Sequence, residues 1–244
     1  MRSSIRGEYL YRHPPADEVS TQEGGLGTLT PTEVPTFECA PASGRRAQYA
    51  VKRVIDVVLA SMGLVLLSPI LLGIVVAVKW STPGAVFFAQ ERVGMCGRRF
   101  RLYKFRTMTS GAAKHVDEVF YLNQANGPLF KAKDDPRVTQ VGKMLRRTFM
   151  DELPQLVNVL RGDMSLVGPR PCLPAEAAQM GEHVSFRFAV PQGLTGPWQA
   201  NGHHALTFDD QMRVEREYVQ SWSLGKDVRI LLRTIPLVLR RAGL

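Results

Sequence analysis

The sequence predicts an α+β protein associated with a membrane, mostly helical and with a small β-hairpin. An apolar run of about 25 residues covers positions 54–78, which is long enough for one straight helix to cross a bilayer. Two short strand-like runs, 86–89 and 100–105, flank a Gly-rich connection, as the strands of a hairpin do. Beyond them, apolar residues recur at helical spacing in 153–160 and 228–239, so most of the remaining chain is expected to be helical.

Residues 1–46 are expected to form a disordered tail. Prolines alternate there with Gly, Ser, Thr and Glu, and no helical or strand period persists. No apolar stretch follows the early arginines, so a secretory signal is not predicted. The expected division is therefore a tail at 1–46, a membrane segment at 47–80 and a compact domain at 81–244.

The apolar run is interrupted by Ser68 and Pro69. Proline removes a backbone hydrogen bond from a helix, and the Ser68 hydroxyl can bond the carbonyl that loses its donor. Basic residues flank both ends of the run, so the positive-inside rule does not assign the ends to opposite sides of a membrane. Asp56 follows Arg53 by one turn, as in an interfacial ion pair. Two geometries stay open: a kinked spanning helix, and a re-entrant helix that breaks at Ser68 and Pro69 and returns.

The predicted hairpin has a strongly basic surface. Most of its Arg and Lys side chains are expected to face solvent or lipid headgroups. Lys104 and Arg106 alternate with apolar neighbours and so share one strand face, and these two are our candidates for contact with a substrate phosphate.

Two adjacent carboxylates, Asp151 and Glu152, precede a predicted short helix. Its apolar stripe, its first-turn proline and the glycine that ends it support this prediction, and the residues are Leu153, Leu156, Val157, Leu160, Pro154 and Gly162. A helix N-terminus favours ionised carboxylates and a nearby phosphate. The alternative is an ordinary capping role, with Asp151 as the N-cap and Glu152 as a first-turn acid.

Arginines crowd the same stretch, at positions 146, 147, 161 and 170. Gly168, Pro169 and Pro171 are expected to hold Arg170 in a stiff turn. Carboxylates that bind Mg²⁺, with arginines that bind phosphate oxygens, would form a site for phosphate esters, in which Arg146 and Arg170 are the candidate phosphate contacts. A structural network of ion pairs would have the same composition, so both interpretations stay open.

The C-terminal stretch predicts a helix from 208 to 222, begun near Thr207, and a basic amphipathic helix beyond Gly225, kinked at Pro236. The second helix could lie in a headgroup plane or pack on the compact domain.

The composition narrows the function classes. The chain has 31 Lys and Arg against 22 Asp and Glu, a formal charge of +9, which suits an acidic partner. No recognisable nucleic-acid-binding motif or aromatic-rich basic platform is present, so nucleic acid is not expected as a partner. The phosphate loops of nucleotide hydrolases, GxxxxGK[ST] and GxGxxG, are also missing.

From about Val51 to Leu244 the chain resembles the monotopic phosphoglycosyl transferases, also called bacterial sugar transferases. The resemblance rests on ordered motifs, namely KRVIDVVLA with the Ser68 and Pro69 break, FFAQERVG, YKFRTM, DDPRVTQVGKMLRRT, DELPQLVNVLRGDMSLVGPRP and GLTGPWQANG. It implies a re-entrant helix in the bacterial inner membrane, a catalytic domain on the cytoplasmic face, and Mg²⁺ held by an Asp-Glu pair that matches Asp151 and Glu152.

The activity that the resemblance implies is transfer of a phosphosugar from a nucleoside diphosphate sugar, by family habit a UDP-sugar, to polyprenyl phosphate, with undecaprenyl phosphate as the expected acceptor. Asp151 would form a covalent intermediate with the phosphosugar, and a nucleoside monophosphate would leave. The product would begin an exopolysaccharide, capsule, O-antigen or glycoprotein pathway. A homodimer is compatible with the sequence, which sets neither the oligomeric state nor the sugar.

Two positions depart from the family pattern. Gln192 stands where the family usually has Pro, and His203 stands where it usually has an Arg thought to contact a substrate phosphate. Histidine is mostly neutral at pH 7, so His203 would give a weaker, pH-dependent contact. The alternative function is therefore a non-catalytic membrane scaffold of a glycan assembly complex.

Overall fold

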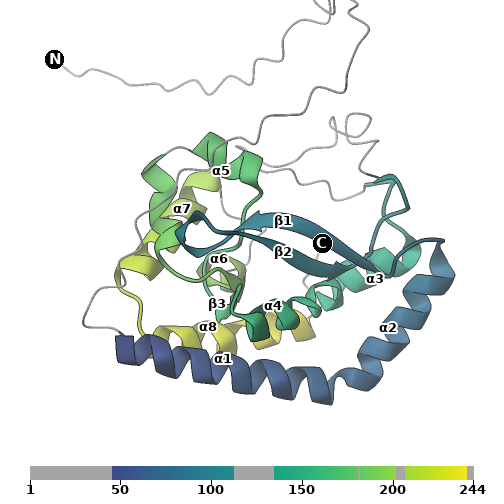
Figure 1. The fold of residues 1–244 in the computed structure, drawn as a ribbon, viewed down its shortest axis with the longest axis horizontal. Coiled ribbons are helices and arrows are strands. Elements are labelled where there is room, and N and C mark those ends of the chain that lie inside the picture. The colour runs from purple at the N-terminus through teal and green to yellow at the C-terminus, as the bar shows by residue number, and fades with distance from the viewer. Residues whose placement is uncertain (1–45, 113–134, 181, 202–206, 241–244) are drawn as a thin grey trace, which may run out of the picture. The chain divides into compact units, whose positions relative to one another are not determined.

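The computed structural model describes residues 46–112, 135–180, 182–201 and 207–240, all within one compact unit, Glu33–Leu244. The helices are α1 (Arg46–Leu66), α2 (Ser68–Ser81), α3 (Gln140–Arg147), α4 (Gln155–Arg161), α5 (Pro174–Met180), α6 (Pro197–Ala200), α7 (Phe208–Gln220) and α8 (Leu224–Leu239). The strands are β1 (Phe87–Val93), β2 (Arg99–Phe105), β3 (Ser165–Val167) and β4 (Gly193–Thr195). Single 3₁₀ segments cover Met95–Gly97, Met150–Glu152 and Glu182–Ala189. The mostly helical α+β class is confirmed (Figure 1). The predicted tail and the division of the chain stay predictions, because residues 1–45 lie outside the described ranges.

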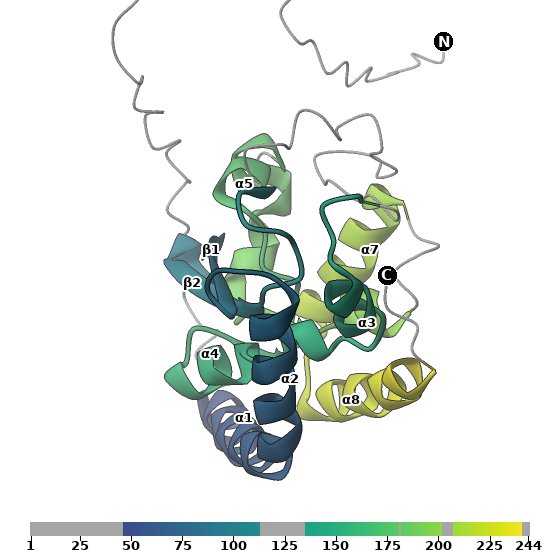
Figure 2. The ribbon, with the colours of Figure 1, turned by 90° about the vertical axis from the view of Figure 1, so that its right-hand side faces the viewer.

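The apolar run forms two helices that meet at a break. No single described helix is long and apolar enough to cross a membrane, but α1 and α2 together pass that test, bent by 63°. The break falls where the sequence predicts it, because Pro69 in the first turn of α2 cannot donate to the carbonyl of Val65. The Ser68 hydroxyl donates to that carbonyl instead, at 2.8 Å. The corner of this bent pair lies at the lowest edge in Figures 1 and 2.

The first half of α1 packs on the domain through polar as well as apolar side chains. The Lys52 ammonium lies 2.6 Å from Asp227 of α8, and both side chains are buried. Asp56 accepts the backbone N–H of Leu166 at 3.0 Å, while Arg53 donates to carbonyls at the end of α4. The expected interfacial pair of Arg53 with Asp56 is therefore wrong, because Arg53 binds the end of helix α4 and Asp56 binds strand β3.

The hairpin is confirmed. β1 and β2 pair antiparallel from Phe87 opposite Phe105 to Val93 opposite Arg99. A second, smaller sheet was not expected: β3 and β4 pair in parallel, Ser165 with Gly193 and Val167 with Thr195. This pairing brings the stretch after the carboxylates next to the GLTG segment.

Three groups of buried apolar residues hold the described elements together. One lies among α1, α4, β3, α7 and α8 and contains Ala60, Leu156, Val159, Val167, Tyr218 and Trp222. The second joins the end of β1 to α5, the 3₁₀ segment Glu182–Ala189 and α7, and contains Val93, Met180, Val184, Phe188 and Met212. The third packs α2 on β2 and α3 through Ile74, Val78, Phe105 and Leu145. Helix α2 is therefore held on the domain from Leu71 to Val78, near the hairpin.

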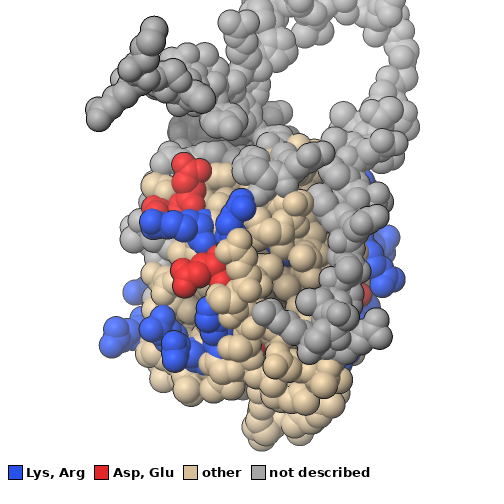
Figure 3. Space-filling model, turned by 90° about the vertical axis from the view of Figure 1, so that its left-hand side faces the viewer, with Lys and Arg blue, Asp and Glu red and all other residues tan. Residues whose placement is uncertain are grey.

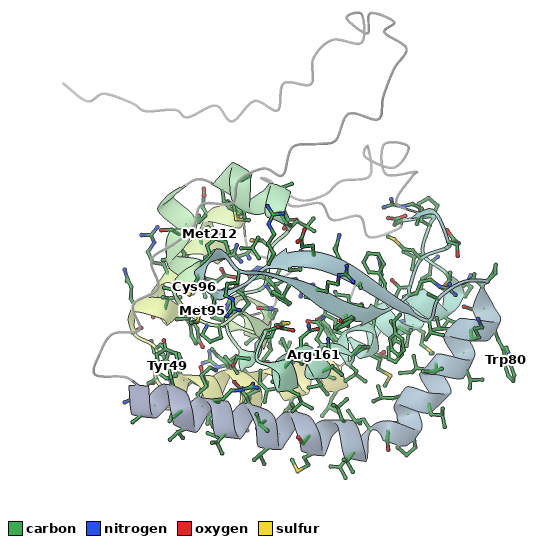
Figure 4. The ribbon with its side chains drawn as sticks, in the orientation of Figure 1. Tyr49, Trp80, Met95, Cys96, Arg161 and Met212 are labelled. Atoms are coloured by element: carbon green, nitrogen blue, oxygen red, sulfur yellow. The ribbon has the colours of Figure 1, made fainter. Side chains whose placement is uncertain are left out.

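Helix α7 begins after Thr207, as the sequence predicts, and α8 begins at Leu224, just before the predicted start beyond Gly225. Thr207 caps α7 and Ser223 caps α8, each accepting a backbone N–H three residues on. Helix α8 continues through Pro236 to Leu239, and its exposed apolar residues are Val228, Leu232, Ile235, Val238 and Leu239. Exposed apolar residues also cover the bent pair, and Trp80 projects from the end of α2 with 86% of its surface exposed (Figure 4).

Candidate functional site

Asp151 and Glu152 lie in a 3₁₀ turn between α3 and α4, rather than at the N-terminus of a regular helix. Phe149 adopts a left-handed conformation, φ 57°, which ends the α3 segment and turns the chain into the carboxylates. Helix α4 begins at Gln155, with Pro154 at its N-cap position and no side chain capping it. The alternative in which Asp151 is an N-cap is therefore wrong. Gly162 ends α4 in a left-handed conformation, φ 85°, as predicted.

Glu152 is held by two cations. Its Oε1 lies 2.6 Å from Lys104 Nζ and 2.9 Å from Arg170 Nη2. Burial alone would raise the pKa of Glu152, but the charges and hydrogen bonds of Arg170 and Lys104 lower it far below its ordinary value. Glu152 in turn raises the pKa of Arg170. This carboxylate is therefore ionised, and it fixes both cations in place.

Asp151 has the opposite surroundings. Its side chain is buried, and its carboxylate forms no hydrogen bond or ion pair with any residue that the structure describes. Burial raises the pKa of Asp151, Lys104 opposes this, and the neighbouring charge of Glu152 adds to the rise. The two adjacent carboxylates thus differ: Glu152 accepts two cationic donors on one oxygen, and Asp151 accepts none from the described residues.

Arg146 lies on the Asp151 side of the site. Its Nε donates to Thr107 Oγ1 at 3.0 Å, burial lowers its pKa, and the charge of Asp151 acts in the opposite direction. Thr107 is itself fixed, because its carbonyl accepts the N–H of Thr139 at 3.0 Å. Of the four arginines predicted to crowd this stretch, the structure brings Arg146 and Arg170 to the carboxylates.

The other predicted basic residues lie elsewhere. Arg161 donates to the hydroxyl of Tyr103 at 2.9 Å, and Arg147 is exposed. Arg106 lies beyond the end of β2 and donates to the carbonyls of Val78, Pro83 and, at 2.7 Å, Thr82 at the end of α2. These contacts give it a role in holding α2, so its predicted phosphate contact has no support in the geometry. His203 falls outside the described residues.

The turn that carries Arg170 is held by close backbone packing. A Cβ placed on Gly168 would come within 2.2 Å of the Pro191 carbonyl oxygen, and one on Gly193 within 2.1 Å of the Gly168 nitrogen. Gly196 is equally crowded, against the Gly168 carbonyl at 2.2 Å. Only glycine allows the GPRP and GLTG segments to approach so closely. This close contact restricts the backbone position from which the Arg170 side chain extends.

Gln155 was not singled out by the sequence. It lies four residues after Asp151, is buried, and its Nε2 has no hydrogen-bond partner in the described part of the chain. A buried amide without a partner is costly, which is why such groups often bind a ligand. Its position in the DELPQ motif, one turn beyond the carboxylates, is the signal that could have identified it.

The residues present fit a magnesium ion that also binds substrate. Among the described residues no group of three or more His, Cys, Asp and Glu could hold a metal by itself. Mg²⁺, however, commonly uses one or two carboxylates together with waters and substrate phosphates. The unpaired oxygens of Asp151, with ionised Glu152 beside them, are donors of that kind.

A family model described as bacterial sugar transferase matches residues 47–241. The chain is 39% identical over 196 residues to the exopolysaccharide production protein ExoY of Sinorhizobium fredii, an alignment that covers 79% of this chain and 87% of that protein.

Longer relatives match over part of their length. The chain is 40% identical over 210 residues to the UDP-glucose:undecaprenyl-phosphate glucose-1-phosphate transferase of Escherichia coli, covering 83% of this chain and 42% of that protein. It is 38% identical over 197 residues to an uncharacterized sugar transferase of Haemophilus influenzae, covering 79% of this chain and 42% of that protein. The chain thus spans less than half the length of these two relatives.

Proposed function

Because the chain belongs to the bacterial sugar transferase family, we propose that it transfers a phosphosugar from a UDP-sugar to undecaprenyl phosphate. The products are undecaprenyl diphosphate sugar and UMP. The name of the E. coli relative supports this donor and acceptor, and the S. fredii name supports a place in exopolysaccharide production. Relatives are also named for galactose and N-acetylgalactosamine transfer, so no sugar is assigned.

The observation that carries the proposal is the unequal pair Asp151 and Glu152. A nucleophile needs a free oxygen, and neither oxygen of Asp151 has a donor within the described residues, whereas Oε1 of Glu152 accepts two. A carboxylate needs no base to activate it once it is ionised. Glu152 pairs with Lys104 and Arg170 through Oε1 and so fixes these two cations beside Asp151.

The reaction proceeds in two displacements. In the first, an Asp151 oxygen bonds to the β-phosphorus of the donor, and the bond from that phosphorus to the oxygen of UMP breaks. In the second, an oxygen of undecaprenyl phosphate bonds to the same phosphorus, and the bond to Asp151 breaks. Arg146, Arg170 and Lys104 stabilise negative charge on the phosphates in both steps, and Gln155 Nε2 is available as a further donor.

Asp151 and Glu152 would hold Mg²⁺, with the remaining ligands supplied by the donor diphosphate. The ion, when bound, would offset charge on the departing phosphate. Its positive charge would also counter the burial that raises the pKa of Asp151.

We place the protein at the cytoplasmic face of the bacterial inner membrane. The bent pair α1 and α2 enters one leaflet and returns, and the exposed apolar residues of α8 lie in the interface. The corner of the pair carries Met62, Val65, Leu66 and Ile70, all exposed. Exposed apolar surface of this extent is expected where a protein meets lipid.

The test is release of UMP by protein held in nanodiscs with undecaprenyl phosphate, Mg²⁺ and a panel of UDP-sugars. We expect turnover with at least one sugar, and its loss in Asp151→Asn, which keeps the shape of the side chain and removes its charge. Asp209→Asn, on the exposed side of α7, is the matched control and keeps full activity. An active Asp151→Asn variant would exclude the covalent mechanism. A folded protein that is silent with every sugar would favour the non-catalytic scaffold.

A further inference from the structure

The turn that carries Arg170 is braced at three successive carbonyls. Arg187 Nη2 donates to the carbonyl of Arg170 at 2.8 Å, Arg92 Nη1 donates to that of Pro171 at 3.2 Å, and the N–H of Val93 donates to that of Cys172 at 3.0 Å. Pro169 and Pro171 restrict the backbone on both sides of Arg170. The backbone position of Arg170 therefore depends on donors that come from other elements.

Arg187 is the more deeply buried of the two donor arginines. Only 2% of it is exposed, and its Nε lies 2.5 Å from Oε2 of Glu215 in α7, which is fully buried. Gln211 donates to the other Glu215 oxygen at 3.2 Å. Because the guanidinium is planar, the Glu215 contact fixes the direction of Nη2 toward Arg170.

The backbone of Arg187 is held as well. Gln192 is fully buried, and its Nε2 donates to the carbonyl of Arg187 at 2.7 Å and to that of Val190 at 3.1 Å. Gln192 is the residue that departs from the family pattern, in which Pro is usual. In this chain its amide ties together the segment between Arg187 and β4, so the departure supplies contacts that a proline could not make.

Stability alone does not account for a buried arginine and glutamate. Removing both charges from water is costly, and well-packed apolar residues of the same volume often stabilise a protein as well or better. Apolar residues could not, however, donate a directional hydrogen bond to the Arg170 carbonyl. The contacts thus form one continuous line, from Glu215 through Arg187 and the Arg170 backbone to Glu152.

We propose that Arg187 is a positioning residue of the transferase site: oriented by Glu215, it sets the place of Arg170 and, through it, that of Glu152. It contacts neither Asp151 nor Glu152, and its effect on turnover passes through Arg170. The inference rests on the proposed function for its effect on turnover. Its effect on the turn itself can be measured without turnover.

The test compares Arg187→Lys with Arg170→Ala and with the double variant. Lysine replaces the planar fork by one ammonium, so it cannot keep both the contact of Nε with Glu215 Oε2 and that of Nη2 with the Arg170 carbonyl. The control is Arg53→Lys in α1, which also loses an arginine-to-carbonyl hydrogen bond, but one made to the end of α4. Two quantities are measured: kcat/KM per folded protein, and hydrogen exchange of the peptide covering 165–173.

We expect Arg187→Lys to lower kcat/KM about tenfold, the effect of one charge-assisted hydrogen bond. In the Arg170→Ala background the same change has almost no further effect on kcat/KM, because the side chain through which Arg187 acts on the site has been removed. Exchange of the peptide 165–173 rises in Arg187→Lys and stays at the wild-type rate in Arg53→Lys.

Losses that multiply in the double variant would overturn the inference, since they would mean that Arg187 acts independently of Arg170. An unchanged exchange rate at 165–173 would overturn it too, whether or not the wild-type protein turns over. If the wild-type protein released no UMP but the exchange result were as expected, the proposed function would be contradicted. The inference that Arg187 holds the Arg170 turn would still stand.

Discussion

Asp151 and Glu152 are neighbours in the chain with different partners, and the difference comes from residues far away in sequence. Lys104 reaches Glu152 from β2, and Arg170 reaches it from the turn after β3. Both cations bind the same oxygen of Glu152 and so offset its negative charge, whereas Asp151 has no ion-pair partner among the described residues. The two carboxylates thus differ in partners and in pKa because the cationic donors bind only one of them.

Gly168 is the residue at which this arrangement is most easily disturbed. In Gly168→Ala the new methyl group would overlap the Pro191 carbonyl, so the turn carrying Arg170 must move. We expect a loss of about 1–3 kcal/mol in the free energy of unfolding, typical of overpacking, and a fall in turnover beyond the loss of folded protein. Denaturant unfolding and UMP release measure the two effects.

The control is Gly73→Ala in α2, where a Cβ would meet nothing within 4 Å. There the helix gains up to about 1 kcal/mol, because alanine is the better helix former. Equal free energies of unfolding and equal UMP release for Gly168→Ala and Gly73→Ala would show that the packing around Gly168 can relax.

Individual residues were predictable where a local pattern fixes a direction. Lys104 could be assigned to a strand face, and the structure places it on Glu152. Arg106 was assigned to the same face, but β2 ends at Phe105, so the alternation no longer applies to it. Arg187 could not have been found from spacing, because its partner Glu215 is distant and in another helix.

Among the elements, the turn that leads into α3 is fixed by a single carboxylate. Asp135 is buried, accepts the N–H of Arg137 at 3.0 Å and pairs with its guanidinium at 2.6 Å. The hydrogen bonds from Arg137 hold the pKa of Asp135 below its ordinary value. Helix α3 carries Arg146, so this turn positions one side of the site.

A lowered pKa implies a pH-dependent contribution to stability. The contribution of Asp135 is fully present above its unfolded pKa, about 3.9, and is lost as the pH falls through the folded value. Asp135→Asn should therefore destabilise the protein at pH 7 by about 1–3 kcal/mol, and the difference from wild type should shrink below pH of about 4. Urea unfolding between pH 3 and pH 7 tests this, with Asp209→Asn as the exposed control. A difference that stays constant over this range would exclude the Arg137 contact as its source.

The bent pair of α1 and α2 can be tested for the geometry that the sequence leaves open. If the pair is re-entrant, Gln48→Cys and Ser81→Cys lie on the same side of the membrane, since these exposed positions stand near its two ends. A membrane-impermeant maleimide should then label both in inverted vesicles and neither in intact spheroplasts. The parent chain, with its three cysteines, measures the background. Labelling of one position on each side would show a spanning helix.

Elements with a strong local signal were predictable, and those made by distant pairing were not. The break at Ser68, the hairpin and the caps of α7 and α8 all follow from neighbouring residues. The strands β3 and β4 have three residues each, too few for a period, and they form because Gly168 and Gly193 let two distant segments meet. The second sheet therefore depends on tertiary packing that no window of sequence contains.

Across the described molecule, charge and apolar surface are separated. Viewed from the N-terminal end of α1, Lys and Arg gather toward one side with a few Asp and Glu beside them, and the lowest part of this face carries neither (Figure 3). Many of the exposed apolar residues belong to α1, α2 and α8, and α1 and α8 run along the lower part of the view in Figure 1. Composition predicted an acidic partner through the charge of +9, but only the fold divides the surface in this way.

The buried pair of Lys52 and Asp227 has a consequence for how the chain is made. These residues are 175 positions apart, so α1 emerges from the ribosome long before the carboxylate that neutralises its lysine exists. An unpaired ammonium cannot be buried at low cost, and Lys52 must stay hydrated until α8 has been synthesised. The first helix can meet lipid early, but it can be fixed on the domain only after α8 has been synthesised.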